Sequence, residues 1–430
     1  MSTQIGVGVS HHRNPTIAGK AAAGQACRQA AIDLLDDQPD FVMLFATVGY
    51  RQPLLLKSVR EVTRQAPLIG CSGAGVIAQG IADESNFAVT VLVIKSDEMR
   101  FAHGLETGIK ASSAQAGAAV GEAITRSTPT MGAAMGAATD AAIGTEVDAK
   151  ALFLFLEGIS PNFDEFMEGL RSRTTLEQSI PAIGGFAGDD LSIRETFQYC
   201  DDQIVTDGAA WALLLGEVQV ASAMSHGCMP VGERHIVTKS SRNAVYEVDG
   251  RPVLDLLHSY LTEAERGDWS IAPVMLGWAF DASEASFETP EELQLAQRDR
   301  SIIRAMAAKD EQSGAIYMMS DVVEGSSFRI SRRDRQKICD TADHMAGSLL
   351  AQIKEQSNHA ARPKLIFQVE CVGRGKLILR EPEKLALMDR LQTKIGKDIP
   401  WIGLYAFAEI GATSGQNCVH NFTGILTALY

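Results

Sequence analysis

Three similar stretches of sequence decide the fold: APLIGCSGAG at residues 66–75, IPAIGGFAGDD at 180–190 and IPWIGLYAFAEIG at 399–411. Each contains Pro-x-Ile-Gly and follows an apolar run and a segment with helical spacing. The chain therefore repeats a unit of strand, helix, Pro-x-Ile-Gly and strand. The prolines, at 67, 181 and 400, are 114 and then 219 residues apart. Because the second gap is nearly twice the first, we expect a degenerate fourth unit between 240 and 340, with APVMLGWAF at 272–280 as its remnant.

The pattern around these stretches predicts alternating strands and helices. We expect strands at 5–9, 41–47, 87–95, 98–103, 151–156, 195–200, 203–206, 209–215, 218–225, 364–371 and 418–429, and helices at 16–36, 52–65, 161–174 and 381–397. The Ala/Gly-rich region 111–148 is expected to begin as a helix and to continue, from about 127, as a flexible surface insertion.

These repeats predict an α/β fold of layered α/β sandwiches. Each strand-helix-strand unit covers one face of its sheet with a helix, so the other face needs cover as well. A sheet from another repeat is the most economical cover. The closely spaced strands after each Pro-x-Ile-Gly favour mixed or antiparallel sheets over one doubly wound parallel sheet.

Composition restricts the class of protein. The chain has 430 residues, with 39 basic and 53 acidic side chains and a net charge of −14, which disfavours nucleic acid and anionic membranes as general partners. The N-terminus lacks the pattern of a signal peptide, and no run of about 18 apolar residues occurs. Seven cysteines without Cys-x-x-Cys are typical of reduced thiols. We therefore expect a cytoplasmic protein.

Glycine-rich turns after the first two repeats are candidate ligand contacts. Ser72 and Gly73 lie in a turn that matches no phosphate-binding motif, so we predict a tight turn that lines a small-molecule pocket. In the second repeat Gly185 precedes two adjacent acids, Asp189 and Asp190. These acids could bind a cation or a ligand ammonium group; the alternative is a turn in which they bind the loop backbone.

The third repeat carries an arginine and a carboxylate that suit a zwitterion. Arg374 follows a strand between two glycines, and Glu409 lies in the Pro-x-Ile-Gly stretch itself. At opposite ends of one pocket they would bind the carboxylate and ammonium groups of an amino acid. The alternative is a surface ion pair.

Four other residues have the spacing of metal ligands: His226 with Cys228, and Cys418 with His420. They would form a Cys2His2 zinc set only if the repeats brought them together. A buried thiol and a hydrogen-bonded histidine is the alternative for each pair. His226 is also the candidate axial ligand for a non-covalent haem.

Catalysis has little support in the sequence. No Gly-x-Ser-x-Gly motif occurs, and Cys71 or Cys371 would need a histidine base to act as a nucleophile. We therefore expect a protein that is not an enzyme. A cysteine-dependent enzyme and a protein-interaction scaffold remain the alternatives.

The motifs together resemble the FIST proteins. The similar stretches, in order, are APLIGCSGAGVI, IPAIGGFAGDD with TDGAAWALLLG, the joint from VQVASAMSHGC to GRPVLDLL, CVGRGKLIL, and IPWIGLYAFAEIG with NCVHNFTGILTAL. They span most of the chain. One departure is Val76, where the resemblance implies a glutamate after Gly75.

The resemblance implies a FIST N-terminal domain at 1–235 and a FIST C-terminal domain at 236–430, in a bacterial sensory input protein. The implied ligand is a small molecule such as an amino acid, and one branch of the family implies haem-based nitric oxide sensing. The implied partner is a separate signalling protein, such as a histidine kinase or a diguanylate cyclase or phosphodiesterase. Asn421, in NCVHNFTG, completes the predicted ligand-binding residues.

Overall fold

Each Pro-x-Ile-Gly stretch forms a strand that pairs in parallel with the strand before its helix. The structure is a computed structural model, and it describes residues 3–33, 37–134, 148–267, 276–280, 301–358, 361–413 and 415–430. The three strand-helix-strand sets are β2 (Phe41–Ala46), α2 (Gln52–Val62) and β3 (Leu68–Ser72); β8 (Ala149–Leu156), α4 (Phe163–Arg171) and β9 (Ala182–Phe186); and β21 (Leu365–Cys371), α10 (Glu381–Ile395) and β22 (Trp401–Ala406). The three predicted repeats are confirmed.

Each repeat also has an edge strand and helix before this set, and a hairpin and closing strand after it. Unit 1 adds β1 (Thr3–Ser10), α1 (Pro15–Gln29), β4 (Gly75–Ala78), β5 (Ile81–Asp83) and β6 (Val89–Ser96). Unit 2 adds β7 (Met99–Thr107), α3 (Ser113–Ala134), η1 (Leu176–Gln178), β10 (Gln198–Cys200), β11 (Gln203–Val205) and β12 (Gly208–Gly216). Unit 3 adds β13 (Val220–Ser225), α9 (Arg335–Gln356), η2 (Val372–Arg374), β23 (Ala408–Thr413), β24 (Gln416–His420) and β25 (Gly424–Leu429).

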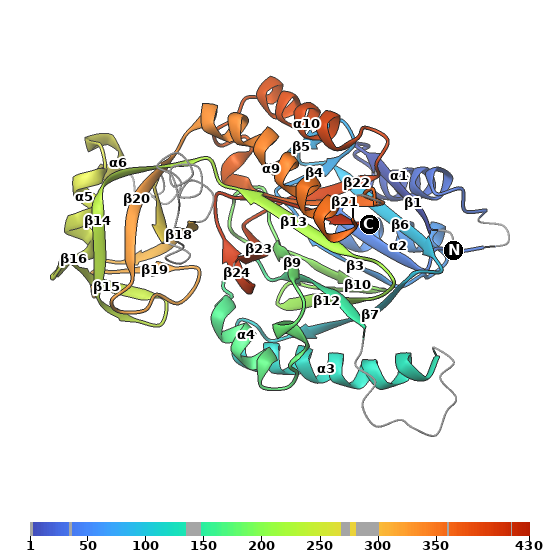
Figure 1. The fold of residues 1–430 in the computed structure, drawn as a ribbon, viewed down its shortest axis with the longest axis horizontal. Coiled ribbons are helices and arrows are strands. Elements are labelled where there is room, and N and C mark those ends of the chain that lie inside the picture. The colour runs from blue at the N-terminus through green and yellow to red at the C-terminus, as the bar shows by residue number, and fades with distance from the viewer. Residues whose placement is uncertain are drawn as a thin grey trace.

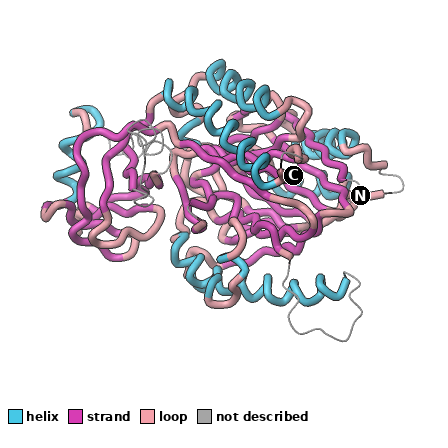
Figure 2. The backbone as a smooth tube through the Cα atoms, in the orientation of Figure 1, coloured by secondary structure: helices cyan, strands magenta, loops and turns pink. Residues whose placement is uncertain are grey.

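The three units exchange their hairpins in a cycle. The sheet orders are β1-β6-β2-β3-β10-β11, β7-β12-β8-β9-β23-β24 and β13-β25-β21-β22-β4-β5. Each sheet thus holds four strands of its own unit and the hairpin of another. Figure 1 shows these three sheets together in the larger part of the molecule, which we call the larger body, and Figure 2 shows helices on the outside of this body. The layered arrangement of mixed sheets predicted from the sequence is confirmed.

Three backbone hydrogen bonds tie the crossing segments together. The amide of Ala74 donates to Tyr405 O at 2.9 Å, that of Gly188 to Ser72 O at 2.9 Å, and that of Phe407 to Phe186 O at 3.1 Å. Every donor lies seven residues after the repeat proline and every acceptor five residues after it. The three bonds therefore form a closed ring, in which each unit bonds to a different one.

The glycine of Pro-x-Ile-Gly is required because the parallel strand passes very close. A Cβ on Gly70, Gly184 or Gly403 would lie 1.9, 2.0 or 2.1 Å from the carbonyl oxygen of Leu44, Leu154 or Gln368, respectively. No side chain fits at that distance. The core between the three sheets is aromatic, with Phe45, Phe155 and Phe367 in mutual contact at ring centroid distances of 5.1 to 6.1 Å.

A closed sheet is inserted into unit 3 between β13 and α9. Its strands are β14 (Cys228–Ser241), β15 (Ala244–Val248), β16 (Arg251–Pro252), β17 (Leu276–Phe280), β18 (Ile302–Asp310), β19 (Ala315–Met318) and β20 (Ser327–Arg333), with the helices α5 (Val253–Tyr260) and α6 (Glu263–Gly267). The order is β14-β20-β17-β18-β19-β15-β16, closed by a pairing of β14 with β15. The chain leaves and returns at one point, because Asp334 N donates to Gly227 O at 3.1 Å.

The predicted fourth unit is wrong. Its proposed remnant contains β17, which pairs antiparallel with β18 and β20 of the closed sheet rather than in parallel through a helix. The doubled gap between the second and third prolines comes instead from the inserted sheet. The expected division near residue 235 falls within β14 and stays a prediction.

Three element boundaries also differ from expectation. Helix α1 ends at Gln29, before the expected 36, and the single strand expected at 418–429 is split into β24 and β25 by a turn at 421–423. Helix α3 continues to Ala134, so the flexible insertion expected from 127 does not begin there. The rest of that prediction, 135–147, lies outside the described residues. No helix in the described ranges is long and apolar enough to cross a membrane.

Candidate functional site

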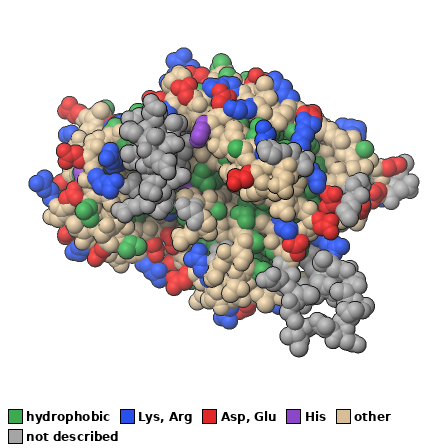
Figure 3. All heavy atoms as spheres, in the orientation of Figure 1, with side chains coloured by type: hydrophobic (Ala, Val, Ile, Leu, Met, Phe, Trp, Pro, Cys, Tyr) green, Lys and Arg blue, Asp and Glu red, His purple; other side chains and the backbone are tan. Residues whose placement is uncertain are grey.

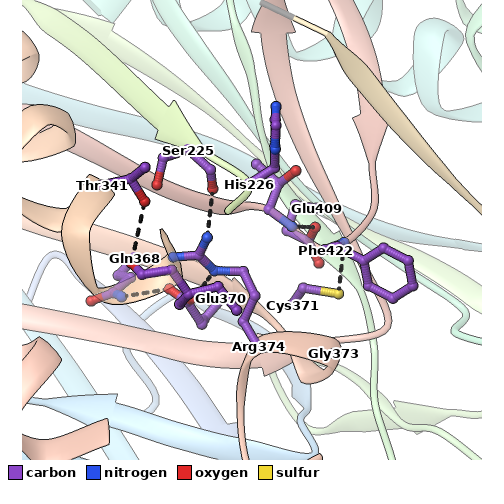
Figure 4. Close-up of polar contacts among 12 residues, drawn as sticks. Ser225, His226, Thr341, Gln368, Glu370, Cys371, Gly373, Arg374, Glu409 and Phe422 are labelled. Carbon is purple, nitrogen blue, oxygen red and sulfur yellow. Dashed lines mark hydrogen bonds and ion pairs between the residues drawn. The ribbon is translucent and has the colours of Figure 1, made fainter. Parts of the chain in front are cut away.

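A buried group of polar side chains lies where the strands of unit 3 end (Figure 4). Glu370 is the penultimate residue of β21, Arg374 ends η2 and Glu409 lies in β23. Cys371 and His226 complete what we call the unit 3 cluster. All five residues are at most 5% exposed. Buried ionisable groups at this density are unusual in a core, because each must be paired or neutral.

Arg374 and Glu370 form the ion pair of this cluster. Four residues apart across the turn after β21, they are joined by a hydrogen bond from Arg374 Nε to Glu370 Oε1. Glu370 Oε2 also accepts from Gln368 Nε2 at 2.9 Å, and Arg374 Nη1 donates to Ser225 O at 2.9 Å. Arg374 Nη2 is buried without a hydrogen-bond partner in the described part of the chain. One NH2 group of the guanidinium therefore has no hydrogen-bond partner among the described residues.

Glu409 is the second carboxyl group of the cluster. Burial raises its pKa well above the usual value and the nearby Glu370 adds to the shift, although Cys371, Thr423 and Arg374 oppose it. Its Oε2 accepts from Thr423 N at 3.1 Å, while Oε1 is buried and has no partner among the described residues. The shift favours the protonated acid over the carboxylate.

His226 is held as a neutral imidazole. Its Nδ1 accepts from Cys228 N at 2.9 Å, which places the ring proton on Nε2. Burial, together with the charges of Lys337 and Arg374, lowers its pKa to about 3. Nε2 is buried without a described partner, and the ring points away from the Arg374 guanidinium group (Figure 4).

This geometry does not fit haem at His226. An axial nitrogen must present a lone pair to iron, whereas Nε2 carries the proton and Nδ1 already uses its lone pair for Cys228. The described surroundings of Nε2 are closed as well, because the side chain is only 5% exposed. His226 therefore has the environment of a hydrogen-bonded structural histidine.

The cluster adjoins the inserted closed sheet through the turn at 421–423. Asn421 N donates to Ile303 O at 3.0 Å, and Asn421 Oδ1 accepts from Ala305 N at 2.9 Å. Phe422 N donates to Cys371 Sγ at 3.1 Å, and Arg333 of β20 lies over the Phe422 ring at 5.0 Å. The turn thus contacts β18 and β20 on one side and the cluster on the other. Figure 3 shows hydrophobic side chains near the middle of one face, between the closed sheet and the larger body.

The predicted residues of units 1 and 2 lie outside this cluster, and Gly185 borders it. Ser72 Oγ donates to Gly188 O at 2.7 Å and accepts from Phe197 N at 3.0 Å, which cross-links units 1 and 2. Gly73 lies at the ring of backbone bonds, where a Cβ would be 3.2 Å from Tyr405 O. Gly185 pairs with Glu409 across β9 and β23.

The adjacent acids of unit 2 bind their own loop. Asp189 is buried and accepts from Leu191 N, Ser192 Oγ and Arg194 N, each at 2.8 Å. Asp190 is exposed and accepts from Ser192 N at 3.2 Å. The geometry is therefore the loop-stabilising turn that the sequence left as an alternative.

The candidate nucleophiles and zinc ligands have structural environments. Burial raises the pKa values of the Cys71 and Cys371 thiols well above normal, which suppresses the thiolate form. Of the described residues, only His103, Cys200 and Asp201 are grouped as metal ligands could be, so His226, Cys228, Cys418 and His420 do not form the zinc set. His420 Nε2 instead lies 3.2 Å from Thr413 Oγ1.

Glu370, Gln368 and Ser225 were missed in the sequence. The signal was present in KLIFQVEC, where a glutamine and a glutamate alternate in an otherwise apolar strand. Polar residues on one face of a buried strand indicate a polar partner on that face. The partner, Arg374, was singled out, but its pairing with Glu370 was not.

Comparison with known proteins places this chain in a family. The FIST N domain matches residues 40–251 and the FIST C domain matches residues 255–412. An uncharacterised protein of Mycobacterium tuberculosis is 25% identical over 98% of both chains, and one of Mycobacterium bovis is 23% identical over 98% of this chain and 97% of its own. An uncharacterised protein of Methanocaldococcus jannaschii is 26% identical over 47% of this chain and 37% of its own.

Among solved structures, PurLQS from Thermotoga maritima aligns with 99% of this chain and 72% of its own at 10% identity. The TM-score is 0.23, which is too low to support an argument about fold or function.

Proposed function

This chain belongs to the FIST family, and from that premise we propose that it is a non-catalytic, cytoplasmic input protein of signal transduction. It binds a small zwitterion, an amino acid or a similar molecule, at the unit 3 cluster. Binding regulates a separate effector protein.

The observation that carries the proposal is the pair of unused groups on Arg374 and Glu409. Arg374 Nη2 is a buried cationic donor, and Glu409 Oε1 is a buried carboxyl oxygen. Leaving such groups unpaired costs about 1–3 kcal/mol each, so native proteins rarely keep them without a purpose. A ligand carboxylate would accept from Arg374, and a ligand ammonium group would pair with Glu409 after that acid loses its proton.

The route from ligand to output runs through the turn at 421–423. Thr423 N bonds to Glu409, and Asn421 bonds to β18 of the closed sheet. A change in the charge of Glu409 alters the bond at Thr423 and so the seating of the turn. The closed sheet is then the element that reports occupancy to the partner, for which a histidine kinase or a cyclic-di-GMP enzyme remains the expectation from the family resemblance.

A thermal-shift screen tests the ligand class. Amino acids, the matching carboxylic acids and the matching amines are added to the purified chain. We expect the melting temperature to rise with at least one amino acid and to rise less with the acid or amine that lacks one charged group. The Glu409→Gln variant keeps the shape of the side chain and should lose the response to the amino acid.

Glu157→Gln is the matched control. Glu157 is also fully buried with a raised pKa, but it lies in unit 2. This variant should keep the full response. Equal responses from wild type and Glu409→Gln would contradict the proposed site. A Soret band that appears on adding haemin, and shifts with nitric oxide, would contradict the proposed ligand class.

A further inference from the structure

The outer edge of β7 is a row of backbone groups that have no hydrogen-bond partner among the described residues. β7 is the end strand of the unit 2 sheet. Its even-numbered residues bond towards β12, as shown at either end by the bonds from Gly108 N to Asp207 O and from Glu217 N to Glu98 O. The amides of Phe101, His103 and Leu105 therefore point away from the sheet. No hydrogen bond from these amides occurs within the described residues.

Unit 1 shows what covers the same edge elsewhere in the molecule. In β1, Val9 N donates to Gln25 Oε1 and Val7 N donates to Gln29 Oε1, both at 3.0 Å. The glutamines project from α1, which packs against β1. Side-chain oxygens thus replace the missing neighbouring strand, which protects an edge from pairing with another chain.

The described residues of unit 2 provide no such protection. The backbone hydrogen bond from Thr47 N to Ala88 O in unit 1 is equivalent to the bond from Glu157 N to Gly208 O in unit 2, so the two units can be aligned residue by residue from these bonds. In this alignment His103 and Leu105 correspond to Val7 and Val9.

Counted from the helix starts, Gln25 and Gln29 of α1 correspond to Ala123 and Ser127 of α3, which are too short to reach the strand. A groove of about 610 Å³ lies there instead, lined by β7, Ala123, Arg126, Ser127 and Trp211. Trp211 Nε1 is buried without a hydrogen-bond partner in the described ranges.

The sequence of this edge is complementary to itself. If two β7 strands pair antiparallel about His103, Arg100 of one copy lies opposite Glu106 of the other, and Phe101 lies opposite Leu105. Both charged residues lie on the same face of the strand, and both keep solvent exposure. Opposite charges at directly facing positions stabilise antiparallel pairs. The hydrogen-bonding positions agree as well, because the outward amides of residues 101, 103 and 105 in one copy face residues 105, 103 and 101 of the second copy.

We propose that β7 is a dimerisation edge, at which a second copy of this chain pairs antiparallel through residues 99–107 and joins the two unit 2 sheets into one. The occupant is a second copy because Arg100 and Glu106 face each other at both positions when the strand meets itself. The ligand site in unit 3 is separate from this edge, so the inference does not depend on the proposed function.

Sedimentation velocity of the full chain, over a wide range of concentrations, tests the inference by charge exchange. The wild type is expected to dimerise reversibly. Arg100→Glu and Glu106→Arg each place like charges at both facing positions and should weaken the dimer about tenfold. Mixing the two variants restores both attractive pairs, and so does the double variant, so both samples should recover the wild-type affinity.

A second variant transfers the protection of unit 1 to unit 2. Ala123→Gln with Ser127→Gln should cover the outward amides of His103 and Leu105 and reduce dimerisation without changing the net charge. Circular dichroism melting verifies that every variant is folded. A wild type that remains monomeric at all concentrations would overturn the inference. A dimer that is equally strong in both single charge variants would overturn it too.

Discussion

Units 1 and 3 have the same backbone arrangement but differ in the side chains near the ends of β2 and β21. Thr47 N donates to Ala88 O at 2.9 Å in unit 1, and Cys371 N donates to Thr423 O at 3.0 Å in unit 3. The residue before this donor is Ala46 in unit 1 and Glu370 in unit 3. The comparison teaches that the repeated backbone specifies the fold, whereas at this position, which holds Ala46 in unit 1 and Leu156 in unit 2, a buried charge is present only in unit 3. That repeat is also the one that carries the inserted closed sheet.

The largest expected effect on stability comes from replacing the Pro-x-Ile-Gly glycine that the three units share. Replacing Gly70, Gly184 or Gly403 by alanine would place a Cβ about 2 Å from a backbone oxygen that cannot move away. Each variant should lose more than about 4 kcal/mol of unfolding free energy in chemical denaturation. Gly80→Ala, at a turn with φ of +70° and open space around the Cβ, is the control and should lose only about 1–2 kcal/mol. Similar losses at Gly80 and at the repeat glycines would contradict the account.

The next largest effect on stability is expected from breaking the buried ion pair of unit 3. Arg374→Ala leaves Glu370 buried without its cation and should lower the free energy of unfolding by about 3–5 kcal/mol. Adding Glu370→Leu, the residue that unit 2 has at this position, removes the unpaired charge and should recover much of the loss.

Tyr50→Phe is the matched change four residues after Ala46 in unit 1. The Tyr50 hydroxyl is buried without a described partner, so its removal should raise the free energy of unfolding by up to about 1–3 kcal/mol rather than lower it. A double variant less stable than Arg374→Ala would contradict the importance of the pair.

Sequence reasoning found the shared features more readily than the particular ones. The Pro-x-Ile-Gly repeats, the buried strands 41–47, 151–156 and 364–371 and their helices were predictable, because apolar runs and helical spacing are local signals. The exchange of hairpins was not, because nothing in residues 75–83 tells which sheet β4 and β5 join. The fourth unit was predicted from spacing alone, and spacing cannot distinguish a degenerate repeat from an insertion.

The site was predictable only as isolated residues. Arg374 and Glu409 were predicted at opposite ends of one pocket, and the structure places both in one buried region. Their connection through Glu370 and the turn at 421–423 depends on contacts between distant segments. Asp189 and Asp190 had the same appearance in sequence as ligand-binding acids. Only the loop geometry shows that their oxygens are already occupied by backbone amides.

Two buried histidines of unit 3 should each make the fold less stable as the pH falls. Burial lowers the pKa values of His226 and His420 from 6.5 to about 3. Each histidine is therefore neutral in the fold but gains a proton in the unfolded chain below pH 6.5. As pH falls from 6.5 towards 3, each should reduce the unfolding free energy by up to about 1.4 kcal/mol per pH unit.

Urea unfolding across this pH range measures that slope. His226→Asn keeps an acceptor for Cys228 N and should make the slope shallower. His12→Asn, at an exposed residue of unit 1, is the control and should leave it unchanged. The same slope in wild type and His226→Asn would refute the assignment.

The smallest expected effect concerns the edges of units 1 and 2. Gln25→Ala and Gln29→Ala should each cost about 1 kcal/mol, because an edge amide loses its acceptor. Hydrogen exchange should become faster at Val9 in the first variant and at Val7 in the second. The amides of His103 and Leu105 in β7 should already exchange rapidly under monomeric conditions in the wild type. Strong protection of these two amides in a monomer would contradict the comparison.

The most direct test of the central claim is the number of protons released when an amino acid binds. Burial raises the pKa of Glu409 and so favours its protonated form in the free protein, whereas an ammonium group pairs with the carboxylate after the proton leaves. Titration calorimetry in buffers of different ionisation enthalpy measures this number. We expect about one proton released per ligand at neutral pH in wild type and in Glu157→Gln, and none with whatever binding survives in Glu409→Gln. Tight binding to the wild type with no proton release would contradict the claim that unit 3 binds a zwitterion between Arg374 and Glu409.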